Sequence, residues 1–314
     1  MIADRGIFRT KEIEVPVTTA LNASRGSQPR IVGALRERAA AEWMLLAGIT
    51  ALVVPTLFRM SQWSWSKEAG AHGPIVLATT VWLVWREKDH LREGIRQPLW
   101  PGILPLSIAL PLYAVGRITS ILVLESLSLY LMLLTLAYLR YGGRVLRHFW
   151  FPCLYLLFLI TPPENWIFVA TRPLKMALSD AAVAILATTG MAVGSTGSLI
   201  QVEGYQLQVA AACSGLNSLI GIGATSLFYV YLRHGSEPFY ALMLVVMMVP
   251  IALLTNLLRI MGMVYATQLF GPGVVEGLTH EFAGIGTFAL ALLVLVGVDF
   301  MLFPMARRLG WARG

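Results

Sequence analysis

The feature that most constrains this chain is a series of long apolar runs separated by short basic clusters. A membrane-spanning helix needs about 20 apolar residues, and eight runs approach that length: 42–60, 72–86, 99–117, 119–139, 149–163, 213–232, 239–257 and 282–305. Of the 314 residues, 57% are hydrophobic and only 13% are charged, and a soluble core cannot hold that share of apolar side chains. We therefore expect an all-α polytopic membrane protein with about eight transmembrane helices.

Basic residues predict the orientation of these spans. They precede the first run and follow the second, fourth, sixth and last runs: Arg36, Arg38, Arg86, Lys88, Arg92, Arg96, Arg140, Arg144, Arg147, Arg233, Arg307, Arg308 and Arg313. The positive-inside rule places such loops in the cytoplasm. Both termini should then be cytoplasmic, and the number of crossings should be even. The net charge of +7 reflects membrane anchoring on this interpretation, and we expect no nucleic-acid partner.

The chain should have three parts. Residues 1–40 form a polar cytoplasmic tail that lacks the apolar segment of a cleavable signal and is expected to be disordered. Residues 41–306 form the transmembrane domain, and residues 307–314 form a basic cytoplasmic tail.

The stretch 165–190 is only partly apolar. If it crossed the membrane, Arg233 would lie on the outer side, against the positive-inside rule. Its charged residues within the run are Arg172, Lys175 and Asp180. Their spacing allows them to share one helical face. We therefore predict an amphipathic helix along the outer interface, entered after Pro162 and Pro163 end the fifth span.

Three chemically active residues should then meet at the outer face. Cys213 begins the sixth span, Arg259 lies just beyond the outer end of the seventh, and His280 lies just before the outer start of the eighth. Each also has a structural explanation, as a small packing residue, an interfacial anchor and a satisfied polar residue, respectively. Their convergence favours a shared site, but the structural explanations stay open.

A reactive thiol suits this position chemically. A neighbouring cation and a helix N-terminus both favour the thiolate, and Ser214 and Gly215 suit a first helical turn with little bulk. In this hypothesis Cys213 is the nucleophile, His280 is the general acid and base, and Arg259 stabilises the oxyanion. Ser214 is the less favoured nucleophile, because Ala212 replaces the first glycine of the Gly-x-Ser-Gly pattern of intramembrane serine proteases.

At these residues the sequence resembles the exosortase/archaeosortase family of membrane cysteine transpeptidases. The matches are Ala212–Gly215 with the Ala-Cys-Ser-Gly motif, Asn256 and Arg259 with the Asn-x-x-Arg segment, and His280 with the histidine that opens the last helix. The segment "AHGPIVLATTVWLVWREKDHLR", which contains His72, is similar to the family's His-Gly-led second span. The resemblance covers residues 70–305. It departs at Asn217, where many members carry arginine, and this leaves the subgroup open.

The resemblance implies a sorting enzyme of the cytoplasmic membrane whose active site faces the outer side. Such enzymes act on exported proteins that end in a short motif, a transmembrane helix and a basic tail. The acceptor that resolves the thioester stays open between an amine, a glycan and water. We expect no cofactor and no metal. Membrane lipid is the other expected partner, and the oligomeric state stays open. Residues 195–209 alternate well enough for a short β-hairpin over the site, with Gly204-Tyr205 as a turn signal.

Other residues and function classes stay open. His72, at the outer start of the second span, is a second base, a substrate contact or a structural residue. Cys153 lies most of a bilayer away from Cys213, so we expect it to pack and to form no disulfide. The competing class is a non-catalytic membrane component of a polysaccharide export or transport system. Transporters usually carry ionisable residues near the membrane midplane. The middle parts of the spans expected here are nearly free of charge, and Glu125 is the main exception. The third hypothesis is an inactive relative of these enzymes that only binds its partner.

Overall fold

The computed structural model describes residues 17–67, 70–196, 199–202, 205–208, 219–271 and 278–308. The chain divides into two units, Met1–Val54 and Pro55–Gly314. The boundary lies within the first helix, α1 (Val17–Trp63). The described part of the first unit is helical throughout, and every contact discussed below lies within the second unit.

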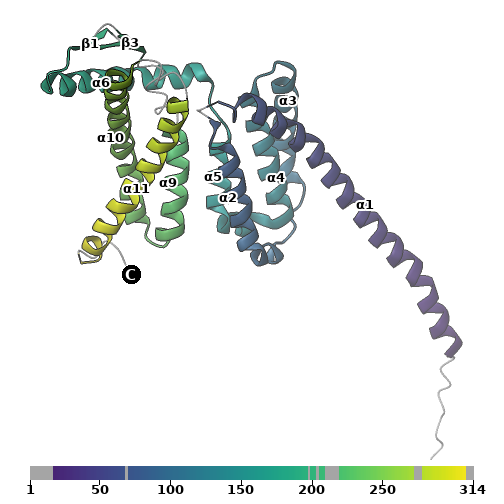
Figure 1. Ribbon diagram of the computed structural model, residues 1–314. Helices are drawn as coiled ribbons and strands as arrows, with labels where there is room; N and C mark the ends of the chain where they lie inside the picture. The colour runs from purple at the N-terminus through teal and green to yellow at the C-terminus, as the bar shows by residue number, and fades with distance from the viewer. Residues whose placement is uncertain are drawn as a thin grey trace, which may run out of the picture. The chain divides into compact units, whose positions relative to one another are not determined.

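Helices make up most of the described chain (Figure 1). After α1 they are α2 (Gly73–Arg86), η2 (Lys88–Glu93), α3 (Trp100–Ile118), α4 (Leu122–His148), α5 (Trp150–Tyr155), η3 (Leu156–Leu159), α6 (Glu164–Thr188), α9 (Leu219–His234), α10 (Pro238–Phe270) and α11 (Leu278–Arg308). Helices α3 and α4, both in the second unit, pack against each other. The expected helical class is confirmed.

Five helices are long and apolar enough to cross a membrane, and the bent pair α5/η3 and α6 would add a sixth if it formed one span. The five are Ala39–Trp63, Trp100–Ile118, Leu122–His148, Pro238–Phe270 and Gly286–Arg308. They coincide with five of the eight expected runs. Helix α2 has 14 residues and the described α9 has 16, so they rise only about 21 and 24 Å, less than a hydrocarbon core of ~30 Å. The count of eight spans therefore stays a prediction.

The chain bends sharply between η3 and α6. The two helical segments meet at 91°, and Pro162 and Pro163 lie between them. Pro163 has φ −56° and ψ 138°, an extended conformation from which the preceding helix cannot continue. The expected turn at this proline pair and the expected helix after it are both confirmed. Placement of α6 along a membrane interface stays a prediction.

One face of α6 packs against α10 and the small sheet. Leu178, Ala182 and Leu186 form an apolar stripe on α6 that contacts Ile260 and Val264 of α10. Lys175 is three residues before Leu178 and is buried with this stripe, whereas Arg172 and Asp180 are exposed. The expectation that the three charged residues share one face is therefore wrong for Lys175, because its position follows the 3–4 residue spacing of the apolar stripe.

A three-stranded antiparallel sheet lies beside α6 (Figure 1). Its strands are β1 (Val193–Thr196), β2 (Leu199–Val202) and β3 (Tyr205–Gln208), in that order. The predicted hairpin is confirmed as β2 and β3, but β1 is an additional strand. Val202 pairs with Tyr205, so Tyr205 begins a strand and does not belong to the turn. Ile200 of β2 is buried in the α6–α10 core.

Helix α9 belongs to two cores. It packs with α10 and α11 around Tyr240, Leu244, Ala252, Ala291 and Leu295. It also packs with α2 and α5 around Val76, Leu83, Phe151, Tyr155 and Ala224. Phe151 stacks on Tyr231 of α9 with 3.6 Å between ring centroids. Residues close to α9 can therefore come from α2 and α5 or from α10 and α11.

Candidate functional site

Part of the predicted catalytic set lies outside the described residues. These are Cys213, Ser214, Gly215 and Asn217. The backbone of His280 is described as the third residue of α11, but its side chain is not. The geometry of the site can therefore be built from Arg259, Asn256 and His72.

Arg259 lies within α10 and not beyond its end. The helix continues to Phe270, so the expectation that the seventh span stops before Arg259 is wrong. Polar residues interrupt the apolar run, but the residues that follow include good helix formers such as Met261, Met263 and Ala266, so the helix continues. The side chain of Arg259 is 7% exposed, which makes it a buried cation and not a solvated anchor.

Asn256 shares the buried face of Arg259, because residues three apart are neighbours on a helix. It is 1% exposed. Neither the Oδ1 nor the Nδ2 atom of its carboxamide has a hydrogen-bond partner among the described residues. A buried amide left without partners costs about 1–3 kcal/mol, and both polar atoms of this carboxamide have unused hydrogen-bonding capacity among the described residues. The pair offers hydrogen-bond donors to a carbonyl or an oxyanion.

His72 occupies the position just before α2 and is 6% exposed. Its Nε2 atom lies 2.8 Å from the carbonyl oxygen of Phe158. A carbonyl accepts, so Nε2 donates, and in the neutral ring Nδ1 then carries the lone pair. Nδ1 is buried and has no partner among the described residues. His72 directly precedes the second helix, as expected, and its Nδ1 atom is available to accept a proton. Its place on the outer side of the membrane stays a prediction.

Gly221 places His72 against the beginning of α9. A Cβ atom at Gly221 would lie 3.2 Å from Cβ and 3.5 Å from Nδ1 of His72. Glycine at this position therefore allows the imidazole to approach the helix backbone closely. Helix α9 contacts both α2 and α10, so His72 and the Asn256–Arg259 pair belong to elements that border the same helix.

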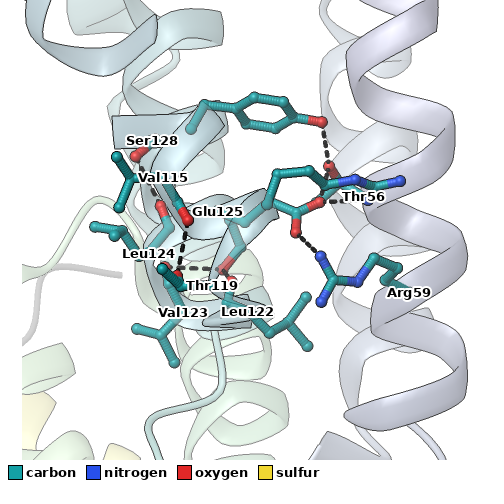
Figure 2. Close-up of polar contacts among 12 residues, drawn as sticks. Thr56, Arg59, Val115, Thr119, Leu122, Val123, Leu124, Glu125 and Ser128 are labelled. Atoms are coloured by element: carbon teal, nitrogen blue, oxygen red, sulfur yellow. Dashed lines mark hydrogen bonds and ion pairs between the residues drawn. The ribbon is translucent and has the colours of Figure 1, made fainter. Parts of the chain in front are cut away.

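A buried carboxylate joins α1, α3 and α4 in the second unit (Figure 2). Glu125 is in the first turn of α4 and is fully buried. Its Oε1 atom accepts from Thr56 Oγ1 at 2.8 Å and from Arg117 at 2.9 Å, and its Oε2 atom accepts from Arg59. Thr56 gives its single proton to the carboxylate, so the Tyr113 hydroxyl, 3.0 Å away, donates to Thr56.

Sequence reasoning identified Glu125 but missed Arg59 and Arg117. It treated Glu125 as an isolated charge within a span, whereas the carboxylate lies near a helix end between two guanidinium groups. The available signal was that Arg59 and Arg117 lie in the last two residues of the expected spans 42–60 and 99–117. The predicted orientation puts these ends on the same side of the membrane as the start of the span that contains Glu125. These ion pairs link α1, α3 and α4 to one another.

A second buried carboxylate was missed altogether. Asp299, within the candidate span of α11, is 2% exposed. Its Oδ1 atom contacts His234 Nε2 and the Tyr240 hydroxyl, each at 2.9 Å, and its Oδ2 atom accepts from Tyr229. Arg233 lies 3.4 Å from Oδ2. The expectation that Glu125 is the main charge within the spans is therefore wrong, and this network ties α9, α10 and α11 together.

Within the described ranges, no group of three or more His, Cys, Asp or Glu side chains has an arrangement that could hold a metal ion. The described site residues are instead a buried cation, an unpaired amide and an imidazole with one available nitrogen. These groups suit hydrogen bonding and proton transfer.

The family comparison covers this whole region. The model of transmembrane exosortases (Exosortase_EpsH) matches residues 64–297, which include all of the site residues predicted from the sequence. Comparisons with curated proteins and with solved structures gave no match. The match extends over well over half of the 314 residues. The chain therefore belongs to the transmembrane exosortase family.

Proposed function

We propose that this protein is a membrane-embedded cysteine transpeptidase that cleaves the C-terminal sorting signal of exported proteins. The signal would consist of a short motif, a transmembrane helix and a basic tail. Family membership supports the reaction class. The observation that carries the proposal on this chain is the buried Arg259–Asn256 pair, whose amide has no partner among the described residues.

In the proposed reaction the Cys213 thiolate attacks the carbonyl carbon of the scissile peptide bond. Arg259 stabilises the negative charge that develops on the carbonyl oxygen, and Asn256 can add a donor. The C–N bond then breaks, and His280 gives its proton to the leaving amine. The resulting thioester is attacked by an amine, a glycan hydroxyl or water, whose proton passes to His280 as the thiolate leaves.

His72 has a supporting role in this proposal. It directly precedes α2 and is buried against Gly221 near the start of α9, and Cys213 precedes α9 in the sequence. Its Nδ1 atom can accept a proton or a hydrogen bond, which makes it the alternative base if His280 does not act. The two histidines predict different outcomes when each is replaced separately.

The proposed topology has eight spans in the cytoplasmic membrane, with α6 along the outer interface and the active site on that side. The 91° bend before α6 supports an orientation across the other helices. In a variant without native cysteines, Ala192→Cys should react with a membrane-impermeant maleimide from outside, and Ser236→Cys should be protected. Both positions are exposed. Labelling of Ser236→Cys from outside would contradict this topology.

The competing proposal is a non-catalytic component of a polysaccharide export or transport system. Asp299 favours it in one respect, because charged residues within spans often mark transport pathways. However, Tyr229, His234 and Tyr240 already engage this carboxylate, which fits a structural link better.

Replacement of the nucleophile separates the two functions. Cys213→Ala and Cys213→Ser should each leave a tailed substrate unprocessed on immunoblots, because a hydroxyl is a far weaker nucleophile than a thiolate at neutral pH. Cys153→Ala is the matched control and should process normally. Normal processing by Cys213→Ala would exclude thiol catalysis and favour the non-catalytic alternative.

A further inference from the structure

A cavity of about 350 Å³ lies where three helices of the second unit begin or end. Its lining includes Trp63, the last residue of α1, Leu122, the first of α4, and Glu164, the first of α6. The volume lies within the range of pockets that hold small molecules. None of these residues belongs to the proposed catalytic set.

The cavity lies at the level where the candidate spans end. One candidate span stops at Trp63 and another starts at Leu122. On the proposed topology, on which this inference rests, the surrounding residues lie at the boundary between hydrocarbon and head groups. Tryptophan is enriched at that boundary. Trp63 is 65% exposed and Ile121, another lining residue, is 50% exposed. Apolar chains can therefore lie against the walls while a polar group occupies the opening.

The charged groups of the lining are Lys67 and Glu164, which form an ion pair. Their side chains are 53% and 68% exposed, respectively. An exposed pair contributes little to stability, so it opens at low cost. The lysine ammonium has three donors and the carboxylate has two oxygens, which leaves capacity for a ligand. The hydroxyl groups of Ser64 and Thr161, which also line the cavity, form a hydrogen bond with each other at 2.6 Å. Lys67 and Glu164 are therefore the main groups that would recognise a polar ligand.

We propose that this cavity binds the head group of phosphatidylethanolamine. The primary ammonium of the lipid donates to Glu164, its phosphate accepts from Lys67, and its chains lie along the apolar walls. Phosphatidylcholine fits less well, because its quaternary ammonium has no N–H donor and is held instead by aromatic cages, whereas this lining has a single tryptophan. Phosphatidylglycerol lacks the cation and leaves Glu164 facing a phosphate.

Lipid competition tests the proposal on the full-length protein. Detergent-purified protein is mixed with equal amounts of phosphatidylethanolamine, phosphatidylcholine and phosphatidylglycerol that carry the same palmitoyl and oleoyl chains. Native mass spectrometry then measures which lipid is retained. We expect phosphatidylethanolamine to exceed phosphatidylcholine about five-fold, the factor that corresponds to about 1 kcal/mol.

Matched variants localise the effect. Glu164→Gln should bring the ratio of the two zwitterionic lipids close to one, and Lys67→Gln should weaken retention of all three lipids. Asp89→Asn, which removes a carboxylate from another exposed ion pair, should keep the wild-type preference. The proposal would be overturned if the wild-type protein showed no preference, or if Glu164→Gln kept the wild-type preference for phosphatidylethanolamine. Displacement of the lipid by a soluble peptide of a sorting signal would assign the cavity to the substrate instead.

Discussion

Replacement of Glu125 by glutamine should destabilise the second unit substantially. The variant keeps the shape of the side chain but removes the charge that two guanidinium groups share (Figure 2). Breaking a buried ion pair typically costs 3–5 kcal/mol. Arg59 and Arg117 are 20% and 40% exposed, so both can turn partly to solvent, and we expect a smaller loss of about 2–4 kcal/mol. At about 2–3 °C per kcal/mol for a large domain, the melting temperature should fall by about 4–12 °C.

The assay is thermal unfolding in one detergent, followed by intrinsic tryptophan fluorescence. Glu93→Gln is the control, because Glu93 is exposed and pairs only with His90 among its described contacts, so its melting temperature should match the wild type. A double-mutant cycle of Glu125→Gln with Arg59→Gln should give a coupling of about 1–3 kcal/mol. If Glu125→Gln melts within 1 °C of the wild type, the cluster does not hold these helices together.

Three further substitutions test other parts of the structure. Asp299→Asn should lower the melting temperature by several degrees, because its histidine and tyrosine partners lose a charged acceptor; an unchanged melting curve would contradict a structural link. Gly221→Val should impair substrate processing, because a Cβ atom there already lies 3.2 Å from Cβ of His72 and the larger side chain would displace the imidazole. Gly223→Val is the control and should process normally, because a Cβ atom at Gly223 meets no atom within 4 Å. Equal processing by both variants would mean that the position of His72 does not matter for the reaction. Arg259→Lys should lower the processing rate about 10²–10³-fold in a folded protein, because the planar donors are lost; near-normal turnover would make it an anchor.

Local patterns in the sequence predict the helical class, the turn at Pro162–Pro163 and the β2–β3 hairpin. Each of these depends on apolar run length, proline stereochemistry or alternation over a few residues. The end of α10 was misplaced for a related reason. Asn256 and Arg259 lower the local hydropathy without interrupting the helix, because apolar residues of the same segment, Ile260 and Val264, pack against α6.

Contacts between distant segments could not be predicted in this way. The partners Arg59 and Glu125 are 66 positions apart, and no local pattern joins them. Asp299 is a single charge in an apolar run of the sequence, and its four polar partners come from α9 and α10. Burial of Lys175 likewise depends on where α10 lies. These features are set by tertiary packing, which a single sequence does not encode locally.

The most direct test of thiol catalysis is to trap the covalent intermediate. Purified protein is incubated with a peptide that carries a sorting signal, quenched in acid, digested and analysed by mass spectrometry. We expect the N-terminal fragment of the peptide on Cys213 as a thioester that hydroxylamine releases as a hydroxamate, in the wild type and in Cys153→Ala but not in Cys213→Ala. Turnover of the peptide by Cys213→Ala, or an adduct on any other residue, would contradict a mechanism in which Cys213 is the nucleophile.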